Sequence, residues 1–494
     1  MRPDPAPIGR SLRHSAANFP ERLALVEVET GAELTYGQLA GLAQRLLVLN
    51  GGGPGRLTLL SERRLVQAAT LAAGLMAGFV VCPINPASTP DAVGRLVRHA
   101  QTSLFLSDTP VPGVSDTPRL AEFRTEGLLV PGALGQSPPL PEAASGGLLV
   151  YTSGSTGAPK GVFLTERHIG ANVEFAVDHF GYGSDWVTGS LLPLFHTFTV
   201  MSDLLPMLVV GGSVIITPGF AIARLKATAR ALADHEVRSY SGVPILFDTM
   251  MAMRFPLPPS IRFAIAGAAP LGETTRTRYA EAYGHPILPC YGLTETTCFA
   301  TVSAPSDIRP SAVGRPAGIE IDIVDDDGRS LPANATGEIC FSGPSVLSGG
   351  YYADEGKHAD EFRRPGWFRT GDVGRVDAEG FVYITGRLKN MLIRGGEKVY
   401  LEDVDRCLEA HPSIAQACVV RVGARRHEDE AVAFVVPREA DGAKLDTAAL
   451  NEHVVTTLGP FSRLDDVVVV GELPRSPSGK LLREVLLRSY VNGA

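Results

Sequence analysis

Residues 146–161 read GGLLVYTSGSTGAPKG. The apolar run at the start of this stretch, which ends at Tyr151, has the length and composition of a buried strand. The residues that follow place three glycines and four hydroxyl side chains around Lys160. Backbone N–H groups, hydroxyls and a lysine in such a loop can wrap a polyphosphate. The stretch therefore predicts a buried strand that leads into a phosphate-binding loop.

This loop has two other possible interpretations. A P-loop of the GxxxxGK[ST] type needs glycine before its lysine and a hydroxyl residue after it. Here Pro159 precedes Lys160 and Gly161 follows it, which excludes that motif. A plain glycine-rich turn remains the simpler alternative when the loop is taken alone.

The rest of the first two-thirds of the chain alternates between short β-branched runs and helical patterns. Apolar residues recur at three- and four-residue spacing in three segments, residues 65–76, 223–234 and 274–283, which predicts helices there. Runs such as LTLLSE, GFVVCPIN, GSVIIT and RFAIAG predict strands between helices. This alternation is typical of an α/β fold with layered parallel sheets.

The pattern of predicted strands and helices changes towards the C-terminus. From about Gly318 short strands and turn residues predict a small β-rich module. The last hundred or so residues carry their own strand and helix pattern. We predict a large domain over residues 1–388 and a separate small α+β domain over residues 389–494.

Composition narrows the class of protein. The chain has 494 residues, 45% of them hydrophobic and 20% charged, with a net charge of −8, as expected for a globular protein of more than one domain. No stripe of Lys and Arg suits a nucleic acid, and the N-terminus lacks a signal-peptide pattern. The most apolar segment, residues 190–217, is interrupted by His196 and Asp203, which favours a buried core over a membrane helix. The six cysteines show no CxxC spacing, so we expect reduced thiols and a cytoplasmic location.

Further motifs follow in a fixed order. They are LPLFHTF (residues 192–198), YGLTETT (291–297), GWFRTGDVG (366–374), YITGRLKNMLIRGGEKV (383–399) and LPRSPSGKLLR (473–483). Together with the first loop they make the chain similar, over nearly its whole length, to the adenylate-forming enzymes. That superfamily includes acyl-CoA synthetases, firefly-type luciferases and the adenylation domains of peptide synthetases.

The resemblance implies a site for ATP and magnesium. Tyr291 is expected to stack on adenine, Thr294 to touch the α-phosphate and Glu295 to help hold Mg²⁺. Asp372 is expected to accept hydrogen bonds from the ribose hydroxyls, with Arg387 beside it. Taken alone, each segment also fits an ordinary cap or turn. The full ATP site implied by the resemblance comprises Thr152, Ser153, Gly154, Ser155, Thr156, Gly157, Lys160, Ala268, Tyr291, Gly292, Thr294, Asp372, Ile384, Arg387 and Lys480.

The resemblance also implies a mobile C-terminal domain. Lys480 matches the lysine that reaches the reacting groups during adenylation, where a cation offsets the charge of a pentavalent phosphoryl transition state. Lys389 falls at the hinge. Arg394, Gly395 and Gly396 match the loop that lines the tunnel for the incoming thiol, where small residues leave room for it. An exposed surface lysine is the alternative for Lys480, and a hairpin turn is the alternative for the glycine loop.

The acid site is expected to include His196, Phe198, Val243, Cys290 and Gly292. His196 stands where amino-acid-activating relatives have an Asp that pairs with the substrate ammonium. An α-amino acid is therefore disfavoured, because its charge would be buried unpaired. A satisfied core histidine remains the other interpretation. The candidate catalytic residues are thus Lys480, Glu295 and His196.

Three functions stay open at this point. The first is an acid–CoA ligase that uses ATP, Mg²⁺ and CoA on an aryl or short to medium aliphatic acid. The second shares the adenylation step but transfers the acyl group to a carrier-protein thiol or an amine. The third is a non-catalytic nucleotide-binding homologue. The oligomeric state is not predicted.

Overall fold

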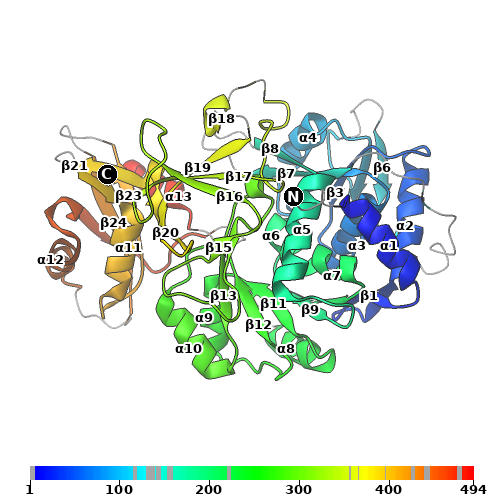
Figure 1. The fold of residues 1–494 in the computed structure, drawn as a ribbon, viewed down its shortest axis with the longest axis horizontal. Helices are drawn as coiled ribbons and strands as arrows, with labels where there is room; N and C mark the ends of the chain where they lie inside the picture. The colour runs from blue at the N-terminus through cyan, green and yellow to red at the C-terminus, as the bar shows by residue number, and fades with distance from the viewer. Residues whose placement is uncertain are drawn as a thin grey trace. The chain divides into compact units, whose positions relative to one another are not determined.

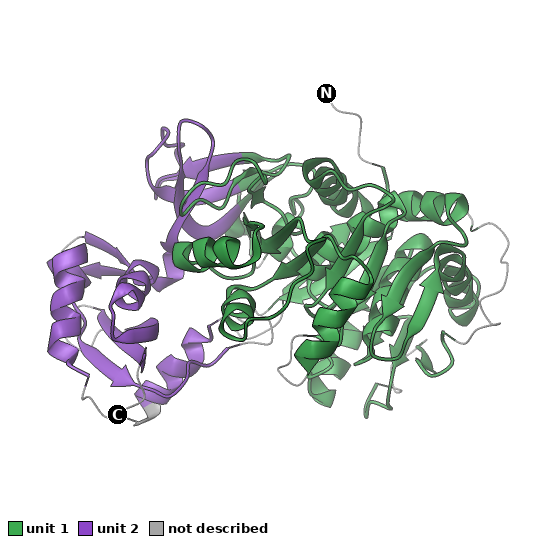
Figure 2. Cartoon of the chain, turned by 90° about the horizontal axis from the view of Figure 1, so that it is seen from below, with its two compact units in different colours: residues 1–320, 341–368 green, residues 321–340, 369–494 purple. Residues whose placement is uncertain are grey.

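The computed structural model describes residues 6–114, 120–129, 140, 146–152, 160–219, 224–354, 356, 358–364, 366–394, 397–423, 429–438, 445–475 and 481–493. The chain divides into two compact units (Figure 2). Unit 1 comprises residues 1–320 and 341–368, and unit 2 comprises residues 321–340 and 369–494. The predicted domain boundary between residues 388 and 389 falls inside unit 2 and stays a prediction.

Unit 1 is built on two mainly parallel sheets. The larger has the order β15 (Arg315–Pro316), β14 (Thr301–Val302), β13 (Ile287–Tyr291), β12 (Phe263–Ala266), β11 (Ser239–Gly242), β9 (Val187–Ser190), β10 (Ser213–Ile216), β1 (Leu23–Glu27) and β2 (Ala32–Thr35). The smaller has the order β6 (Ala121–Arg124), β5 (Leu104–Ser107), β3 (Arg56–Leu60), β4 (Val80–Pro83), β7 (Gly147–Thr152) and β8 (Lys160–Thr165). The predicted runs LTLLSE, GFVVCPIN, GSVIIT and RFAIAG supply β3, β4, β10 and β12.

Helices cover these sheets (Figure 1). They are α1 (Ile8–Asn18), α2 (Tyr36–Leu49), α3 (Arg64–Met76), α4 (Pro90–His99), α5 (Glu166–Phe180), α6 (Thr197–Thr199), α7 (Leu205–Val210), α8 (Leu225–Asp234), α9 (Pro244–Ala252) and α10 (Glu273–Tyr283). Every residue of α3 from Leu65 to Met76 is buried, as expected for a helix that is apolar on all sides. Helix α3 belongs to the core cluster that also contains α2 and strands of both sheets.

Local sequence explains where several helices begin and end. Thr35 and Gln38 form a capping box at the start of α2, since the Gln38 N–H donates to Thr35 Oγ1 at 3.2 Å and the Thr35 N–H donates to Gln38 Oε1 at 2.8 Å. Helix α5 ends at Gly181, whose φ of 67° is the left-handed conformation that glycine adopts without strain.

Unit 2 contains most of the β-rich module and the C-terminal residues. The module comprises β16 (Glu320–Val324), β17 (Gly337–Ser342), β19 (Trp367–Val376) and β20 (Val382–Arg387), and β18 (Phe362–Arg364) pairs with the beginning of β19 in unit 1. The remaining elements are β21 (Met391–Arg394), β22 (Glu397–Tyr400), α11 (Leu401–Ala410), β23 (Ile414–Val422), β24 (Glu430–Pro437), α12 (Thr447–Leu458), β25 (Asp466–Val469) and α13 (Arg483–Gly493). Leu392, Val404, Leu408 and Ile414 belong to its buried core.

The predicted fold class is confirmed. The chain is an α/β protein with parallel sheets in a large N-terminal part and a small C-terminal part. The apolar segment of residues 190–217 lies largely in the core, as predicted, and runs from the last residue of β9 through α6, a π-helical turn and α7 to β10. Among the described residues, no helix combines the length and the apolar character required to cross a bilayer.

Candidate active site

Four neighbouring parallel strands of the larger sheet bring the predicted acid and adenine residues to one edge. The strands β13, β12, β11 and β9 are adjacent and parallel. Tyr291 ends β13, Ala268 follows β12, Val243 follows β11, and His196 lies beyond the end of β9. Ligands of open parallel sheets bind outside the carboxyl ends of the strands, so this edge is the candidate site.

The acid side of this edge is apolar. An added Cβ at Gly267 would lie 2.9 Å from Cys290 Sγ and 2.9 Å from Phe198 Cζ, so both side chains pack against that glycine. Burial raises the pKa of the Cys290 thiol, which keeps it neutral. The rings of His196 and Phe195 are tilted with their centroids 4.4 Å apart. Phe198 and Cys290, both predicted for the acid site, therefore form an uncharged wall beside Gly267.

The YGLTETT segment makes a tight turn directly after β13. An added Cβ at Gly292 would lie 1.5 Å from the carbonyl oxygen of Cys298, so only glycine fits there. Thr294–Thr296 form a 3₁₀ turn, and Thr297 has a φ of 66°. The backbone thus doubles back at this point and places Glu295 in the interior, with 8% of its surface exposed.

Three side chains of unit 1, including that of Lys160, connect the end of the predicted phosphate loop to Glu295. Lys160 forms an ion pair with Glu361 and lies 4.8 Å from the centroid of the Tyr351 ring. The Tyr351 hydroxyl lies 2.6 Å from Glu361 Oε2 and 2.9 Å from Glu295 Oε1. Burial raises the pKa of Glu295, while the hydrogen bond from Tyr351 and the charge of Lys160 oppose that shift. One cation and one hydroxyl therefore hold two carboxylates close together.

The strands that flank the predicted phosphate loop, β7 and β8, are antiparallel. Thr152, at the end of β7, pairs directly with Lys160, at the start of β8. A P-loop leads from a strand into a helix, so the hairpin is a further reason to exclude that motif. Its predicted members Ser153, Gly154, Ser155, Thr156 and Gly157 lie outside the described residues.

The predicted ribose pair lies in unit 2. Asp372 on β19 and Arg387 on β20 are directly opposite each other in antiparallel register. Arg387 Nε lies 2.7 Å from Asp372 Oδ1, and the exposed fraction is 2% for the Asp372 side chain and 43% for that of Arg387. Ile384 pairs with Gly374 on the same two strands. The two strands thus hold the carboxylate and the guanidinium predicted for the ribose directly beside each other.

The structure describes two of the other residues predicted in unit 2, Lys389 and Arg394. Burial lowers the pKa of Lys389, and the nearby charge of Arg387 lowers it further. The Arg394 side chain is 1% exposed; it forms an ion pair with Asp465 and donates hydrogen bonds to backbone carbonyls, including that of Asp429 at 3.1 Å. The Arg394 side chain therefore stabilises the interior of unit 2. Gly395, Gly396 and Lys480 lie outside the described residues.

Glu295 fits the expected magnesium ion. Mg²⁺ at nucleotide sites is held by one or two carboxylates together with phosphate oxygens of the substrate, so few protein ligands are needed. Glu295 supplies a buried carboxylate beside Lys160, the predicted phosphate ligand. Within the described ranges, no group of three or more His, Cys, Asp or Glu side chains is arranged to hold a metal ion by itself.

Two members of this arrangement were not found from the sequence. Tyr351 and Glu361 lie between the YGLTETT and GWFRTGDVG motifs, and their contacts join positions 56 and 201 residues apart in the chain. The only sequence signal was their place in a stretch with aromatic and acidic residues. Ala268 was predicted, but its φ of 66° was not, and strained backbone of this kind gathers at functional sites.

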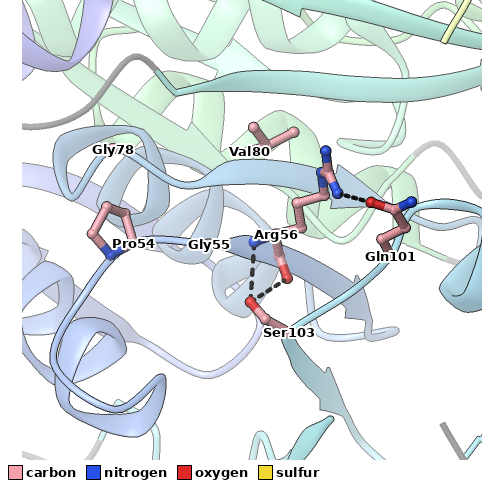
Figure 3. Close-up of a pocket in the computed structure, with 7 residues that line it drawn as sticks. All are labelled: Pro54, Gly55, Arg56, Gly78, Val80, Gln101 and Ser103. Atoms are coloured by element: carbon pink, nitrogen blue, oxygen red, sulfur yellow. Dashed lines mark hydrogen bonds between the residues drawn. The ribbon is translucent and has the colours of Figure 1, made fainter. Parts of the chain in front are cut away.

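A separate pocket lies in the smaller sheet (Figure 3). It has a volume of about 400 Å³ and is lined by Pro54, Gly55, Arg56, Gly78, Val80, Gln101 and Ser103. These residues precede or begin β3, β4 and β5, so the pocket lies at the amino ends of parallel strands. Figure 3 shows Arg56 bonded to Gln101 within it. None of the predicted site residues lines it.

Two family models and several characterised relatives match the chain. The family described as AMP-binding enzyme matches residues 12–352, and the AMP-binding enzyme C-terminal domain matches residues 403–480. The chain is 32% identical to the sulfoacetate–CoA ligase of Cupriavidus necator, with 96% of each chain covered. It is 28% identical to the oxalate–CoA ligase of Arabidopsis thaliana, covering 97% of this chain and 98% of that one.

Solved structures show the same fold. ATP-bound MatB from Rhodopseudomonas palustris superposes with a TM-score of 0.85 at 26% identity, over 98% of this chain and 99% of that one. An anthranilate–CoA ligase, AuaEII, in complex with anthranoyl-AMP gives a TM-score of 0.85 at 23% identity, over 99% and 98% of the two chains.

Proposed function

Because the chain belongs to the AMP-binding enzyme family, we propose that it joins a carboxylic acid to AMP from ATP, releases pyrophosphate, and passes the acyl group to the thiol of CoA. The observation that carries this proposal is the meeting of four parallel strand ends, which places His196, Val243, Ala268 and Tyr291 at one edge. Both the acid and the adenine have residues of suitable chemistry there.

The chemical difficulty of the first step is charge. The attacking carboxylate is an anion at neutral pH, and so is the triphosphate that it approaches. Lys160 supplies a cation beside the phosphate loop, and the ATP phosphates compete with Glu361 for it. Mg²⁺, when bound through Glu295, spreads the charge of the polyphosphate. Thr294 is assigned to the α-phosphate and Tyr291 to the face of the adenine.

Unit 2 contributes the groups that hold the ribose and complete the charge compensation. Asp372 accepts hydrogen bonds from the ribose hydroxyls, while Arg387 holds its carboxylate in place. Lys480 offsets the negative charge that develops on the transferring phosphoryl group. We assign residues 389–494 to a mobile domain that turns about Lys389 between the two steps.

The second step needs a route for the thiol. Gly395 and Gly396 leave space for it, since glycine has no side chain to obstruct the approach. Arg394 acts as a structural anchor of that loop, because its guanidinium bonds the backbone near Phe461 and Asp429 within unit 2. Transfer to CoA agrees with the CoA ligases among the relatives. Transfer to a carrier-protein thiol or to an amine is the alternative.

The acid has an uncharged organic group near its carboxylate. Phe198, Val243 and Cys290 give that side of the site an apolar surface, which suits an aryl or a short to medium aliphatic acid. An α-amino acid is disfavoured, because His196 stands where a counter-charge for its ammonium would be needed. All six cysteines are free thiols, which suits a cytoplasmic enzyme.

Separating the two half-reactions tests the proposal. Lys480→Ala should abolish acid-dependent pyrophosphate exchange and spare thioester formation from supplied acyl-AMP, whereas Gly396→Trp should do the reverse. Lys226→Ala, at an exposed position on α8, is the matched control for the loss of a lysine. Equal loss of both half-reactions in Lys480→Ala would contradict the assigned role. Exchange that proceeds without any acid would contradict the proposed reaction.

A further inference from the structure

The stretch that carries His196 and Phe198 is held by buried charged side chains outside the predicted site. We define residues 190–203 as the gate segment. It runs from the end of β9 through α6 into a π-helical turn, Val200–Leu204. Such a turn is rare in proteins and is found frequently at functional sites. The shape of the gate segment therefore depends on contacts from elsewhere in unit 1.

Arg64, the first residue of α3, holds the beginning of the gate segment. Its Nη2 donates to the carbonyl oxygens of Ser190 at 3.1 Å and Leu192 at 2.7 Å, and its Nη1 donates to that of Leu191 at 3.4 Å. Burial lowers the pKa of Arg64 to about 10, so it stays charged at neutral pH. One guanidinium thus fixes three consecutive carbonyls only a few residues before His196.

Asp203 holds the other end. Its side chain is 1% exposed, and its Oδ1 accepts hydrogen bonds from Ser241 Oγ at 2.6 Å and Ser202 Oγ at 3.2 Å. Its Oδ2 accepts no hydrogen bond from any described residue. The charge of Arg64 favours the ionised carboxylate, and Asp203 in turn favours the charged guanidinium. The two anchors of the gate segment therefore support each other electrostatically.

Asp203 is also connected to residues predicted for the acid site. Ser241 lies on β11, two residues before Val243. Ser202 Oγ donates to the carbonyl oxygen of Phe198 at 2.7 Å, and the Phe198 ring packs against Gly267 beside Cys290. Buried charges are costly, and well-packed apolar residues often give equal or greater stability. Their presence here is better explained by the fixed geometry that they impose.

We propose that Arg64 and Asp203 are positioning residues that hold the gate segment at both ends, so that the acid site keeps one shape and discriminates between acids. This inference rests on the proposed function, since it requires His196 and Phe198 to contact the acid. It predicts that losing either anchor weakens binding of the acid and leaves binding of ATP unchanged.

Asp203→Asn and Arg64→Lys test this directly. In acid-dependent pyrophosphate exchange, we expect the KM for the acid to rise about tenfold, as for the loss of a hydrogen bond to a buried charge, while the KM for ATP stays within about twofold. Asp234→Asn, which removes an exposed carboxylate on α8, is the matched control. Thermal unfolding confirms that each variant is folded, and Arg64→Lys carries the test if Asp203→Asn is not.

A pH profile separates positioning from a purely structural role. Burial raises the pKa of Asp203 to about 7. The charged and titratable groups that act on it or share its segment are Arg64, Tyr182, Cys298 and His196. Burial raises the pKa of Tyr182 and that of Cys298, so neither ionises near neutrality. His196 is unchanged in Asp203→Asn, so the part of the profile that the variant loses belongs to Asp203.

In the wild type, the KM for the acid should rise as the pH falls through about 7, the pKa of Asp203. The reason is that protonated Asp203 no longer offsets the charge of Arg64. The Asp203→Asn variant should lack this change. If the KM for the acid and the KM for ATP rose equally, the inference would be overturned. An unchanged KM for the acid in folded Asp203→Asn and folded Arg64→Lys would overturn it too. A wild type that is inactive with every acid would instead count against the proposed function.

Discussion

Removing the hydroxyl of Tyr351 should weaken productive binding of MgATP. The Tyr351→Phe variant keeps the aromatic ring beneath Lys160, whose Nζ lies 4.8 Å from the ring centroid. It removes the oxygen that lies 2.9 Å from Glu295 Oε1 and 2.6 Å from Glu361 Oε2. The two carboxylates then stay close together without the group that joins them. We expect Glu295 to be less well placed for the metal and Lys160 to be held more tightly by Glu361.

The size of the effect follows from these contacts. A hydrogen bond to a charged group contributes about 1.5–3 kcal/mol. One hydroxyl proton serves only one carboxylate at a time, so the lower value applies to Glu295. That value corresponds to about a tenfold rise in the KM for MgATP. The contacts that the hydroxyl loses are with Glu295 and Glu361 and with none of the residues predicted for the acid site, so the KM for the acid should not change.

Pyrophosphate exchange at varied MgATP and saturating acid measures this effect. Tyr352→Phe is the matched control, because it makes the same chemical change at the next residue, whose ring lies under Arg56 at 5.3 Å. Wild-type kinetics in Tyr351→Phe would refute the assigned role of the hydroxyl. An equal loss in both variants would show that the effect is not specific to the contact with Glu295.

Three other changes have defined outcomes. Asp372→Asn removes a hydrogen-bond acceptor from the predicted ribose site, so the KM for ATP should rise about tenfold. The Tm should change little, because Arg387, the ion-pair partner of Asp372, is partly exposed. Unchanged pyrophosphate-exchange kinetics would contradict this prediction. In Gly267→Ala the new Cβ would lie 2.9 Å from both Cys290 Sγ and Phe198 Cζ, so the KM for the acid alone should rise, and a parallel rise for ATP would count against the placement of the acid wall. The pKa of Asp203 is raised from 3.8 to about 7, so the native state keeps a proton that the unfolded chain releases. The free energy of unfolding should therefore fall as the pH rises from about 4 to about 7, and calorimetry should find this slope smaller in Asp203→Asn; an identical slope would show that Asp203 does not titrate there.

The elements of the fold were largely predictable, because they depend on local pattern. The apolar periodicity of residues 65–76 and the run around Phe263 each gave a helix or a strand close to its observed bounds. The order of the strands was not predictable in this way. Strand β9 lies between β11 and β10, and β1 from the N-terminus joins β10. Such an order depends on long-range packing, which hydrophobic periodicity does not encode.

The candidate active site likewise has a part that local pattern predicts and a part that depends on long-range contacts. The motifs predicted Lys160 and Glu295, which the structure connects through Tyr351 and Glu361. That connection joins three distant segments, so no local pattern could indicate it. The bond between Asp203 and Ser241 is of the same kind, since it depends on the neighbouring positions of the gate segment and β11. Sequence reasoning predicted the reacting groups, and the structure added residues that contact some of them.

The central claim is that this chain activates a carboxylic acid by forming its adenylate and transfers the acyl group to CoA. The most direct measurement incubates the protein with ATP, Mg²⁺, CoA and a panel of aryl and aliphatic acids, and quantifies every nucleotide and thioester product. We predict that at least one acid yields AMP, pyrophosphate and its CoA thioester in equal amounts. Formation of ADP and phosphate instead, or no consumption of ATP by folded protein with any acid, would contradict the account.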